Sequence, residues 1–133
     1  MEFTYDAYKN LIRLLKKNKY TITDYHDYVK AEYPCILRHD IDYSLDKAVR
    51  FSQMEAFMGV RSTYFVMLTN QFYNVLSRSA RESLKELIAC GHEIGLHFDE
   101  TAYGQCSSEE WIDQILYEKE LLENVCGQKV SVV

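Results

Sequence analysis

Residues 35–133 alternate short apolar runs with helical stretches of about ten residues or more, and this order limits the folds open to the chain. The apolar runs are rich in β-branched, aromatic and aliphatic residues, as strands require. Strands are expected at 35–37, 63–68, 92–98 and 129–133, and helices between them at 44–58, 79–90 and 108–125. Strands joined by helices form parallel βαβ units, so the order predicts an α/β fold with a parallel sheet, open or curled into a barrel.

Capping residues mark the ends of these helices. Ser44 is a suitable N-cap for the helix over 44–58, and Ser107 with Glu110 forms the capping-box pattern before the helix over 108–125. Upstream, apolar residues at helical spacing predict an amphipathic helix over 4–17. A short strand at 20–23 and a short helix at 24–30 are expected to follow.

The length of 133 residues fits one ordinary domain, which we expect to span residues 1–133. The last five residues read as an apolar strand without a turn or polar tail after it. An unpaired apolar strand at a sheet edge promotes aggregation. We therefore expect a truncated domain, whose sheet is completed by a missing C-terminal half or by another copy in a homo-oligomer.

Charge and hydropathy narrow the possible partners. The net charge is −5 and no extended run of lysine and arginine is present, which argues against nucleic acid as a partner. The N-terminus lacks a signal-peptide pattern, and no apolar run reaches the ~18 residues of a membrane span. The four cysteines form no C-x-x-C pair. These features predict a cytoplasmic protein without a membrane partner.

Polar side chains gather where two of the expected strands end. Asp40 and Asp42 follow the strand at 35–37, and their spacing places both carboxylates on one face if the strand continues that far. His97 lies near the end of the strand at 92–98, two residues after Gly95. Since the carboxyl ends of parallel strands lie at one edge of the sheet, we expect these groups to meet there. Carboxylate and imidazole groups together suit a divalent metal.

Three runs of the sequence resemble, in order and spacing, the motifs of the polysaccharide deacetylase family. They are Arg38-His39-Asp40-Ile41-Asp42-Tyr43-Ser44, Gly59-Val60-Arg61-Ser62-Thr63-Tyr64-Phe65 and Gly91-His92-Glu93-Ile94-Gly95-Leu96-His97. The resemblance covers residues 35–99, about half of the chain. It implies a distorted (β/α) barrel, here incomplete, and a metal-dependent hydrolase that removes N-acetyl groups from a sugar or a glycan intermediate.

The resemblance also implies roles for individual residues. Asp40 matches the catalytic base of the family, whereas Asp42 and His97 match ligands of a divalent metal, zinc in the first instance. Such a metal lowers the pKa of bound water from 15.7 to about 7 and polarises the amide carbonyl. Tyr43 and Tyr73 lie near these turns and are expected to contact the carbohydrate substrate.

The sequence departs from the family at the second metal histidine, four residues after His97, where it has Thr101. Asp99, Glu100 or Thr101 itself is the candidate to complete the metal shell, because carboxylate oxygen also binds zinc. The later motifs of the family, including a histidine that protonates the leaving amine, would lie beyond Val133.

Two other functions fit parts of the same pattern. One is a non-catalytic relative that binds a carbohydrate or a partner chain through its open sheet edge. The other is a haloacid-dehalogenase-type phosphatase, in which the Asp40–Asp42 pair supplies nucleophile and acid and Thr69 binds phosphate. Arg38 and His39 interrupt the apolar strand that the phosphatase expects before its first aspartate, and that function gives His97 no role.

Overall fold

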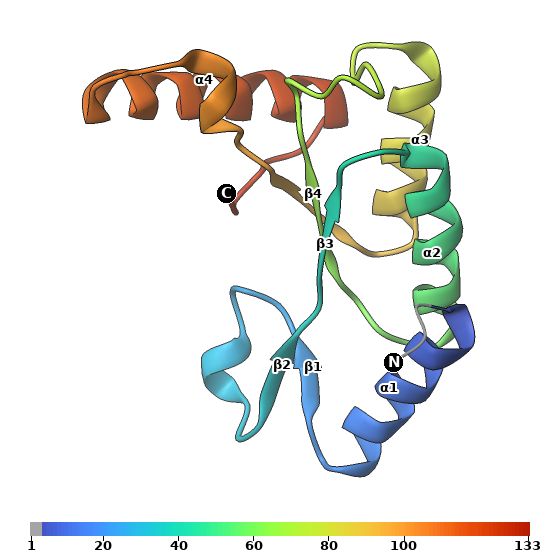
Figure 1. The fold of residues 1–133 in the computed structure, drawn as a ribbon. Helices are drawn as coiled ribbons and strands as arrows, with labels where there is room; N and C mark the ends of the chain where they lie inside the picture. The colour runs from blue at the N-terminus through green and yellow to red at the C-terminus, as the bar shows by residue number, and fades with distance from the viewer. Residues whose placement is uncertain (1–3) are drawn as a thin grey trace.

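The computed structural model describes residues 4–133, beginning with a helix and a small two-stranded sheet (Figure 1). Helix α1 (Tyr5–Lys17) is capped by the Thr4 side chain, which accepts a hydrogen bond from the backbone N–H of Ala7. Strand β1 (Thr21–Thr23) follows and pairs in parallel with β2 (Pro34–Ile36). The expected helix over 4–17 and the strand at 20–23 are confirmed.

The expected helix over 24–30 is wrong in extent, since only the 3-10 turn η1 (Tyr28–Lys30) forms there. The Asp24 carboxylate accepts hydrogen bonds from the backbone N–H groups of His26 at 2.9 Å and Asp27 at 2.8 Å. Such side-chain turns compete with helical hydrogen bonding. The segment therefore forms a turn that connects β1 to β2.

The main sheet contains three parallel strands in the order β3, β4, β5: β3 (Arg38–Ile41), β4 (Thr63–Val66) and β5 (Glu93–Leu96). The run that begins at Arg38 was expected to be a polar turn after a strand, but it is itself strand β3. Its alternation explains this difference: Ile41 is buried toward the helices, whereas Asp40 is exposed on the opposite face. Every residue of β3 has a partner on β4, from Arg38 opposite Thr63 to Ile41 opposite Val66.

Helices α2 (Leu45–Phe57) and α3 (Arg78–Ala89) connect the strands of the main sheet, and helix α4 (Ser108–Cys126) follows β5 after a 3-10 turn, η2 (Glu100–Tyr103). Helices α2 and α3 lie side by side along one side of the strands, and α4 extends away from them (Figure 1). Ser44 and the Ser107–Glu110 capping box act as predicted at the starts of α2 and α4. The expected alternation of parallel strands and helices is confirmed.

The core lies between the sheet and these helices. Aliphatic side chains from strands and helices fill it, and burial of each is worth about 1.5–3 kcal/mol. Fully buried members are Val66, Leu84, Leu87, Ile94, Leu96 and Leu122. None of the helices in the described residues is both long and apolar enough to cross a membrane.

Residues 129–133 do not form the regular strand that their sequence predicts, although they lie beside β5. The backbone N–H of Leu96 donates to the carbonyl oxygen of Val132 at 3.0 Å, and Val130 is buried. Over residues 4–133 the sheet stays open and does not close into a barrel. This is the arrangement expected of an incomplete (β/α) barrel.

Gly95 is required where β4 and β5 pack against each other. A Cβ atom on this residue would lie 2.8 Å from a ring carbon of Phe65 and 3.0 Å from a methyl carbon of Val132. Glycine is therefore the residue that fits this position without displacing the Phe65 ring. The guanidinium of Arg38 lies over the same ring, 3.9 Å from its centroid.

Candidate metal centre

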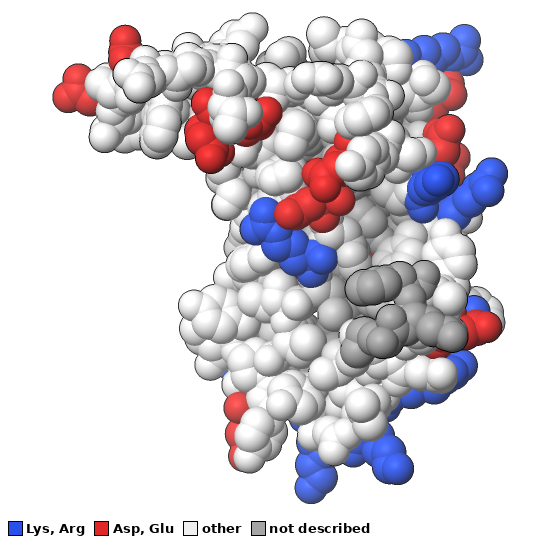
Figure 2. Space-filling view, in the orientation of Figure 1, with Lys and Arg blue, Asp and Glu red and all other residues white. Residues whose placement is uncertain are grey.

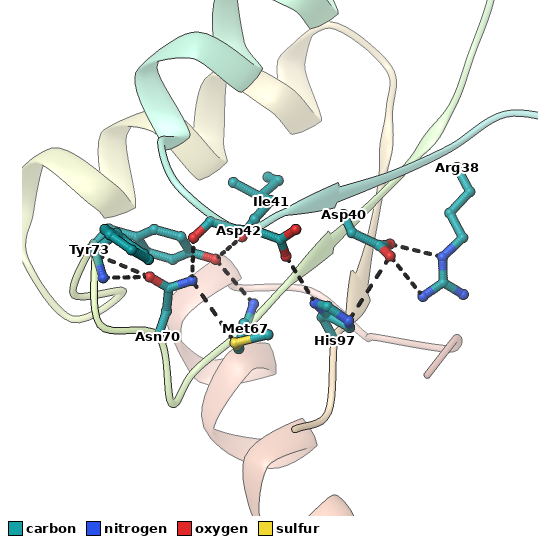
Figure 3. Close-up of polar contacts among 9 residues, drawn as sticks. Arg38, Asp40, Ile41, Asp42, Met67, Asn70, Tyr73 and His97 are labelled. Atoms are coloured by element: carbon teal, nitrogen blue, oxygen red, sulfur yellow. Dashed lines mark hydrogen bonds and ion pairs between the residues drawn. The ribbon is translucent and has the colours of Figure 1, made fainter. Parts of the chain in front are cut away.

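The structure brings Asp40, Asp42 and His97 together at the carboxyl ends of β3 and β5 (Figure 3). Asp40 lies on β3, Asp42 follows the end of this strand, and His97 directly follows β5. The imidazole of His97 lies between the two carboxylates. Its Nδ1 is 3.6 Å from Asp42 Oδ1, and its Nε2 is 4.0 Å from Asp40 Oδ2. The predicted convergence of these residues is present.

The Asp42 side of this imidazole has the chemistry of a cation site. His97 Nδ1 is buried and makes no hydrogen bond within the described residues. An imidazole nitrogen and a carboxylate oxygen bound to one tetrahedral zinc ion at ~2.0–2.1 Å lie about 3.3 Å apart. The observed 3.6 Å is close to this separation and longer than a hydrogen bond. His97 Nδ1 and Asp42 Oδ1 therefore fit as two ligands of a divalent metal.

Asp40 lies on the other side of the imidazole and is held by Arg38. Arg38 Nε donates to Asp40 Oδ1 at 2.8 Å, and a terminal nitrogen of the same guanidinium lies 3.4 Å from Oδ2. This hydrogen bond, with the Coulombic attraction of Asp40, raises the pKa of Arg38 despite partial desolvation. The Arg38–Asp40 ion pair thus holds a negative carboxylate beside the candidate metal site. Figure 2 shows acidic and basic side chains in contact near the middle of the face in view.

Tyr73 lies next to the site, but its hydroxyl is occupied by backbone groups. It donates to the carbonyl oxygen of Ile41 at 2.7 Å and accepts from the backbone N–H of Met67 at 3.1 Å (Figure 3). Burial raises the pKa of Tyr73 to about 12. Tyr73 thus links the ends of β3 and β4. Since its hydroxyl is occupied, the expected contact with substrate would be made by its ring, and this contact stays a prediction.

Two of the three residues considered for a third ligand, Asp99 and Thr101, are hydrogen-bonded to each other. The Asp99 carboxylate caps η2, accepting from the backbone N–H of Thr101 at 3.0 Å and from its hydroxyl at 2.6 Å. Glu100 is exposed at the start of this turn. Within residues 4–133 no group of three or more His, Cys, Asp and Glu side chains lies where it could hold a metal ion. Asp42 and His97 are the pair that the structure offers.

Tyr43 is exposed beside Asp42, and its ring packs on Phe72 with centroids 4.8 Å apart. Phe72 was not among the predicted site residues. It lies on the loop after β4, and this loop is held to the β3 end by Asn70, whose side-chain amide donates to the carbonyl oxygen of Asp42 at 2.8 Å. The sequence signal for Phe72 was its place as an aromatic residue soon after the end of an expected strand, and the sequence analysis did not use it.

A buried carboxylate behind β3 was also missed. Glu55 of α2 has no exposed surface and accepts hydrogen bonds from the hydroxyls of Tyr8, Ser62 and Tyr64 and from His39 Nε2. Burial acts to raise its pKa, but the hydrogen bonds, first of all from His39, outweigh it and hold the pKa below 4.5. An ionised carboxylate thus joins α1, α2, β3 and β4 directly behind the site.

Comparison with known proteins gives a match in structure alone. No family model matches the sequence, and no curated protein matches it. The chitin deacetylase of the fungal pathogen Colletotrichum lindemuthianum superposes with a TM-score of 0.53 at 22% identity, over 68% of this chain and 39% of that one. A family 4 carbohydrate esterase from Bacillus anthracis gives 0.53 at 21% identity, over 98% of this chain and 58% of that one.

A family 4 pseudoenzyme from Bacillus anthracis superposes with a TM-score of 0.55 at 19% identity, over 71% of this chain and 32% of that one. A mutant of it with restored enzymatic activity gives 0.55 at 20% identity. The chain spans between 32% and 58% of the length of these four solved structures. The chain shares their fold, and the expected resemblance to polysaccharide deacetylases is confirmed at that level.

Proposed function

We propose that residues 1–133 form a polysaccharide-deacetylase-like domain that hydrolyses N-acetyl groups on a sugar with the help of a divalent metal. The observation that carries this proposal is the buried His97 Nδ1, which lacks a hydrogen-bond partner in the described residues and faces Asp42 Oδ1 at 3.6 Å. A structural role for His97 would give this nitrogen a partner. The shared fold with carbohydrate esterases supports the same function.

Asp42 and His97 would hold the metal, with zinc as the first candidate because both donor types suit it. When bound, such an ion makes hydroxide available near neutral pH and polarises the acetamide carbonyl. Asp99, Glu100 and Thr101 remain candidates for a further ligand. Asp99 accepts both hydrogen bonds from Thr101 at Oδ1, so Asp99 would bind the metal through Oδ2 and could keep this contact.

Asp40 would accept the proton of the attacking water at Oδ2, the oxygen nearer to His97. The Arg38 guanidinium holds this carboxylate in place and cannot itself take the proton, since it stays charged. Asp40 is 36% exposed, so water reaches it without a conformational change. The proposal therefore assigns proton transfer to Asp40 and metal binding to its two neighbours.

Acetate release tests this proposal. The chain is incubated with the β-1,4-linked tetramer of N-acetylglucosamine, with zinc or with a chelator, and free acetate is measured. We expect release with zinc and none with the chelator. Zinc-independent release would contradict the metal role, and no release with any divalent metal would favour the non-catalytic alternative.

Replacing Arg38 with methionine is expected to reduce kcat about tenfold or more, with KM and zinc affinity nearly unchanged. The two contacts of Arg38 to Asp40 fix the carboxylate, and small misplacement of a catalytic group has large effects on rate. Arg38→Lys restores part of the rate by keeping one charged contact. Arg78→Met, which removes an exposed Arg–Glu pair on α3, is the matched control and leaves kcat unchanged. Equal rates for Arg38→Met and Arg78→Met would contradict this role of Arg38.

A non-catalytic carbohydrate-binding role is the second candidate. It is favoured by the two-ligand metal pair and by the likeness to a solved pseudoenzyme of the same fold. Sugar binding without acetate release is its signature. The phosphatase alternative is disfavoured, because it gives His97 no role, whereas the His97 imidazole lies between Asp40 and Asp42.

A further inference from the structure

The face of the main sheet opposite α2 and α3 carries the Phe65 ring beside the candidate site. Asp40 on β3 is paired with Phe65 on β4, and Phe65 is paired with Gly95 on β5. Partners in a parallel register project to the same face, so Phe65 shares a face with Asp40, and its ring extends over Gly95. The guanidinium of Arg38, which holds Asp40, lies 3.9 Å from the centroid of this ring. Phe65 is therefore the packing surface for the Arg38–Asp40 ion pair.

Tyr25 contacts the same ring from the turn between β1 and η1. The centroids of the Tyr25 and Phe65 rings are 6.1 Å apart and their planes make an angle of 88°, an edge-to-face contact. This part of the chain lies on the side of β3 opposite α2 and α3 (Figure 1). The hydrogen bond to Asp40 is the main cause of the raised pKa of Arg38, and the Tyr25 side chain adds to it. Tyr25 therefore lies beside the guanidinium as well as the ring.

The turn that carries Tyr25 is held by contacts before and after this residue. The Asp24 carboxylate accepts from the backbone N–H of His26 at 2.9 Å. His26 Nε2 lies 2.6 Å from Glu93 Oε1 at the start of β5, and the other oxygen of Glu93 accepts from the Thr63 hydroxyl at 2.9 Å. The turn is thus attached to the main sheet next to Tyr25, and this attachment presses the tyrosine ring against Phe65.

The Arg38–Asp40 ion pair needs such support because both of its side chains reach solvent. Arg38 is 44% exposed and Asp40 is 36% exposed. An exposed ion pair is weak by itself, since two mobile side chains must be held in one geometry. Stacking of the guanidinium on an aromatic face restricts the rotamers of the arginine. The position of the Phe65 ring therefore decides how firmly Arg38 holds Asp40.

We propose that Tyr25 is a positioning residue of the candidate site, which acts through Phe65 and Arg38 on the Asp40 carboxylate. Its effect on catalytic rate rests on the proposed function, whereas its effect on Arg38 can be measured without turnover. The turn over 24–27 lies outside the three runs that resemble deacetylase motifs, so those motifs give Tyr25 no role. Without the Tyr25 ring, the Phe65 ring gains freedom to move, and the guanidinium loses its fixed support.

Solvent exchange of the Arg38 Nε–H proton, measured by ¹⁵N NMR, tests this assignment. In the unchanged chain the hydrogen bond to Asp40 protects this proton. Tyr25→Ala is expected to raise its exchange rate about fivefold or more, and to lower kcat by about the same factor with KM and zinc affinity nearly unchanged. Tyr25→Phe keeps the ring edge and should stay within about twofold of the unchanged chain in both quantities.

Tyr28→Ala is the matched control, because it removes an exposed tyrosine of η1 from the same connection between β1 and β2. It should leave the exchange rate and kcat unchanged. Should Tyr25→Ala fail to fold, His26→Ala replaces it. His26 is half-exposed, and loss of its contact with Glu93 should raise the exchange rate about threefold.

The assignment is overturned if Tyr25→Ala behaves like Tyr28→Ala, if Tyr25→Phe behaves like Tyr25→Ala, or if His26→Ala, used in its place, leaves the exchange rate unchanged. Faster exchange in Tyr25→Ala, in a chain that releases no acetate, would support the role of Tyr25 and contradict the hydrolase. Acetate release together with an Arg38 signal that Tyr25→Ala leaves unchanged would do the reverse.

Discussion

An Asp40→Asn variant is expected to release acetate 10²- to 10⁴-fold more slowly than the unchanged chain while it binds zinc with similar affinity. The amide has the shape of the carboxylate and its oxygen can still accept from Arg38 Nε, but it cannot take a proton from water. Loss of a positioned base typically costs this factor. Acetate release and zinc titration on the same protein sample measure the two quantities.

Asp113→Asn is the control for this substitution, because Asp113 is an exposed aspartate on α4, outside the site. It should change neither quantity. Unaltered acetate release by Asp40→Asn would remove Asp40 from the reaction. A loss of zinc binding by this variant would make Asp40 a metal ligand instead of a base.

The second large effect is on stability: Glu55→Gln is expected to lower the free energy of unfolding by about 3–5 kcal/mol at pH 7. The carboxylate is fully buried, and its removal leaves His39 and three hydroxyl groups without their ionised acceptor. Breaking a buried, hydrogen-bonded charge typically costs this much. Urea unfolding of both proteins at fixed pH gives the difference.

The effect of Glu55→Gln should depend on pH in a defined direction. The folded-state pKa of Glu55 lies below its ordinary value of 4.5, so its ionisation stabilises the fold above about pH 4.5. This contribution is lost as the pH falls through the lower folded-state pKa. The difference in unfolding free energy between the two proteins is therefore expected to shrink from pH 7 to pH 3.

The effect of Glu118 on stability is expected to change with pH in the opposite direction to that of Glu55. It is buried on α4, accepts a hydrogen bond from the Tyr103 hydroxyl, and has one oxygen without a partner in the described residues. Burial raises its pKa above 4.5, so its ionisation destabilises the fold as the pH rises. Glu118→Gln should therefore gain stability relative to the unchanged chain from pH 3 to pH 7. The same pH trend for Glu55→Gln and Glu118→Gln would contradict this account of Glu55.

Much of the fold could be predicted from the sequence because its signals are local. Ser44 and the Ser107–Glu110 box fixed the starts of two helices, and short apolar runs located β4 and β5. The helix predicted over 24–30 was wrong in extent, because the Asp24 carboxylate competes for backbone N–H groups. The spacing of apolar residues does not reveal this competition. The strand at 129–133 was predicted from its apolar residues, whereas the structure gives it a single backbone contact to β5, from Leu96 to Val132.

The candidate site was predictable only where its residues follow strand ends. Asp40, Asp42 and His97 could be placed together because parallel strands bring their carboxyl ends to one edge. Glu55 could not be predicted, since it lies within an ordinary helical pattern. An aromatic residue after the end of β4 was visible at Phe72, but its contact with Tyr43 was not, because the course of this loop depends on Asn70. The sequence offered Asp99, Glu100 and Thr101 as the third metal ligand. It did not predict that Thr101 donates hydrogen bonds to Asp99, because no sequence pattern marks this contact.

The central claim is that Asp42 and His97 bind one cation, with His97 using Nδ1. Zinc titration followed by ¹⁵N NMR of the His97 imidazole tests it most directly, because the two ring nitrogens give separate signals. The account predicts that added zinc shifts the Nδ1 signal and that Asp42→Asn weakens this response at least tenfold. An imidazole that zinc leaves unchanged, or a zinc response that Asp42→Asn leaves intact, would contradict it.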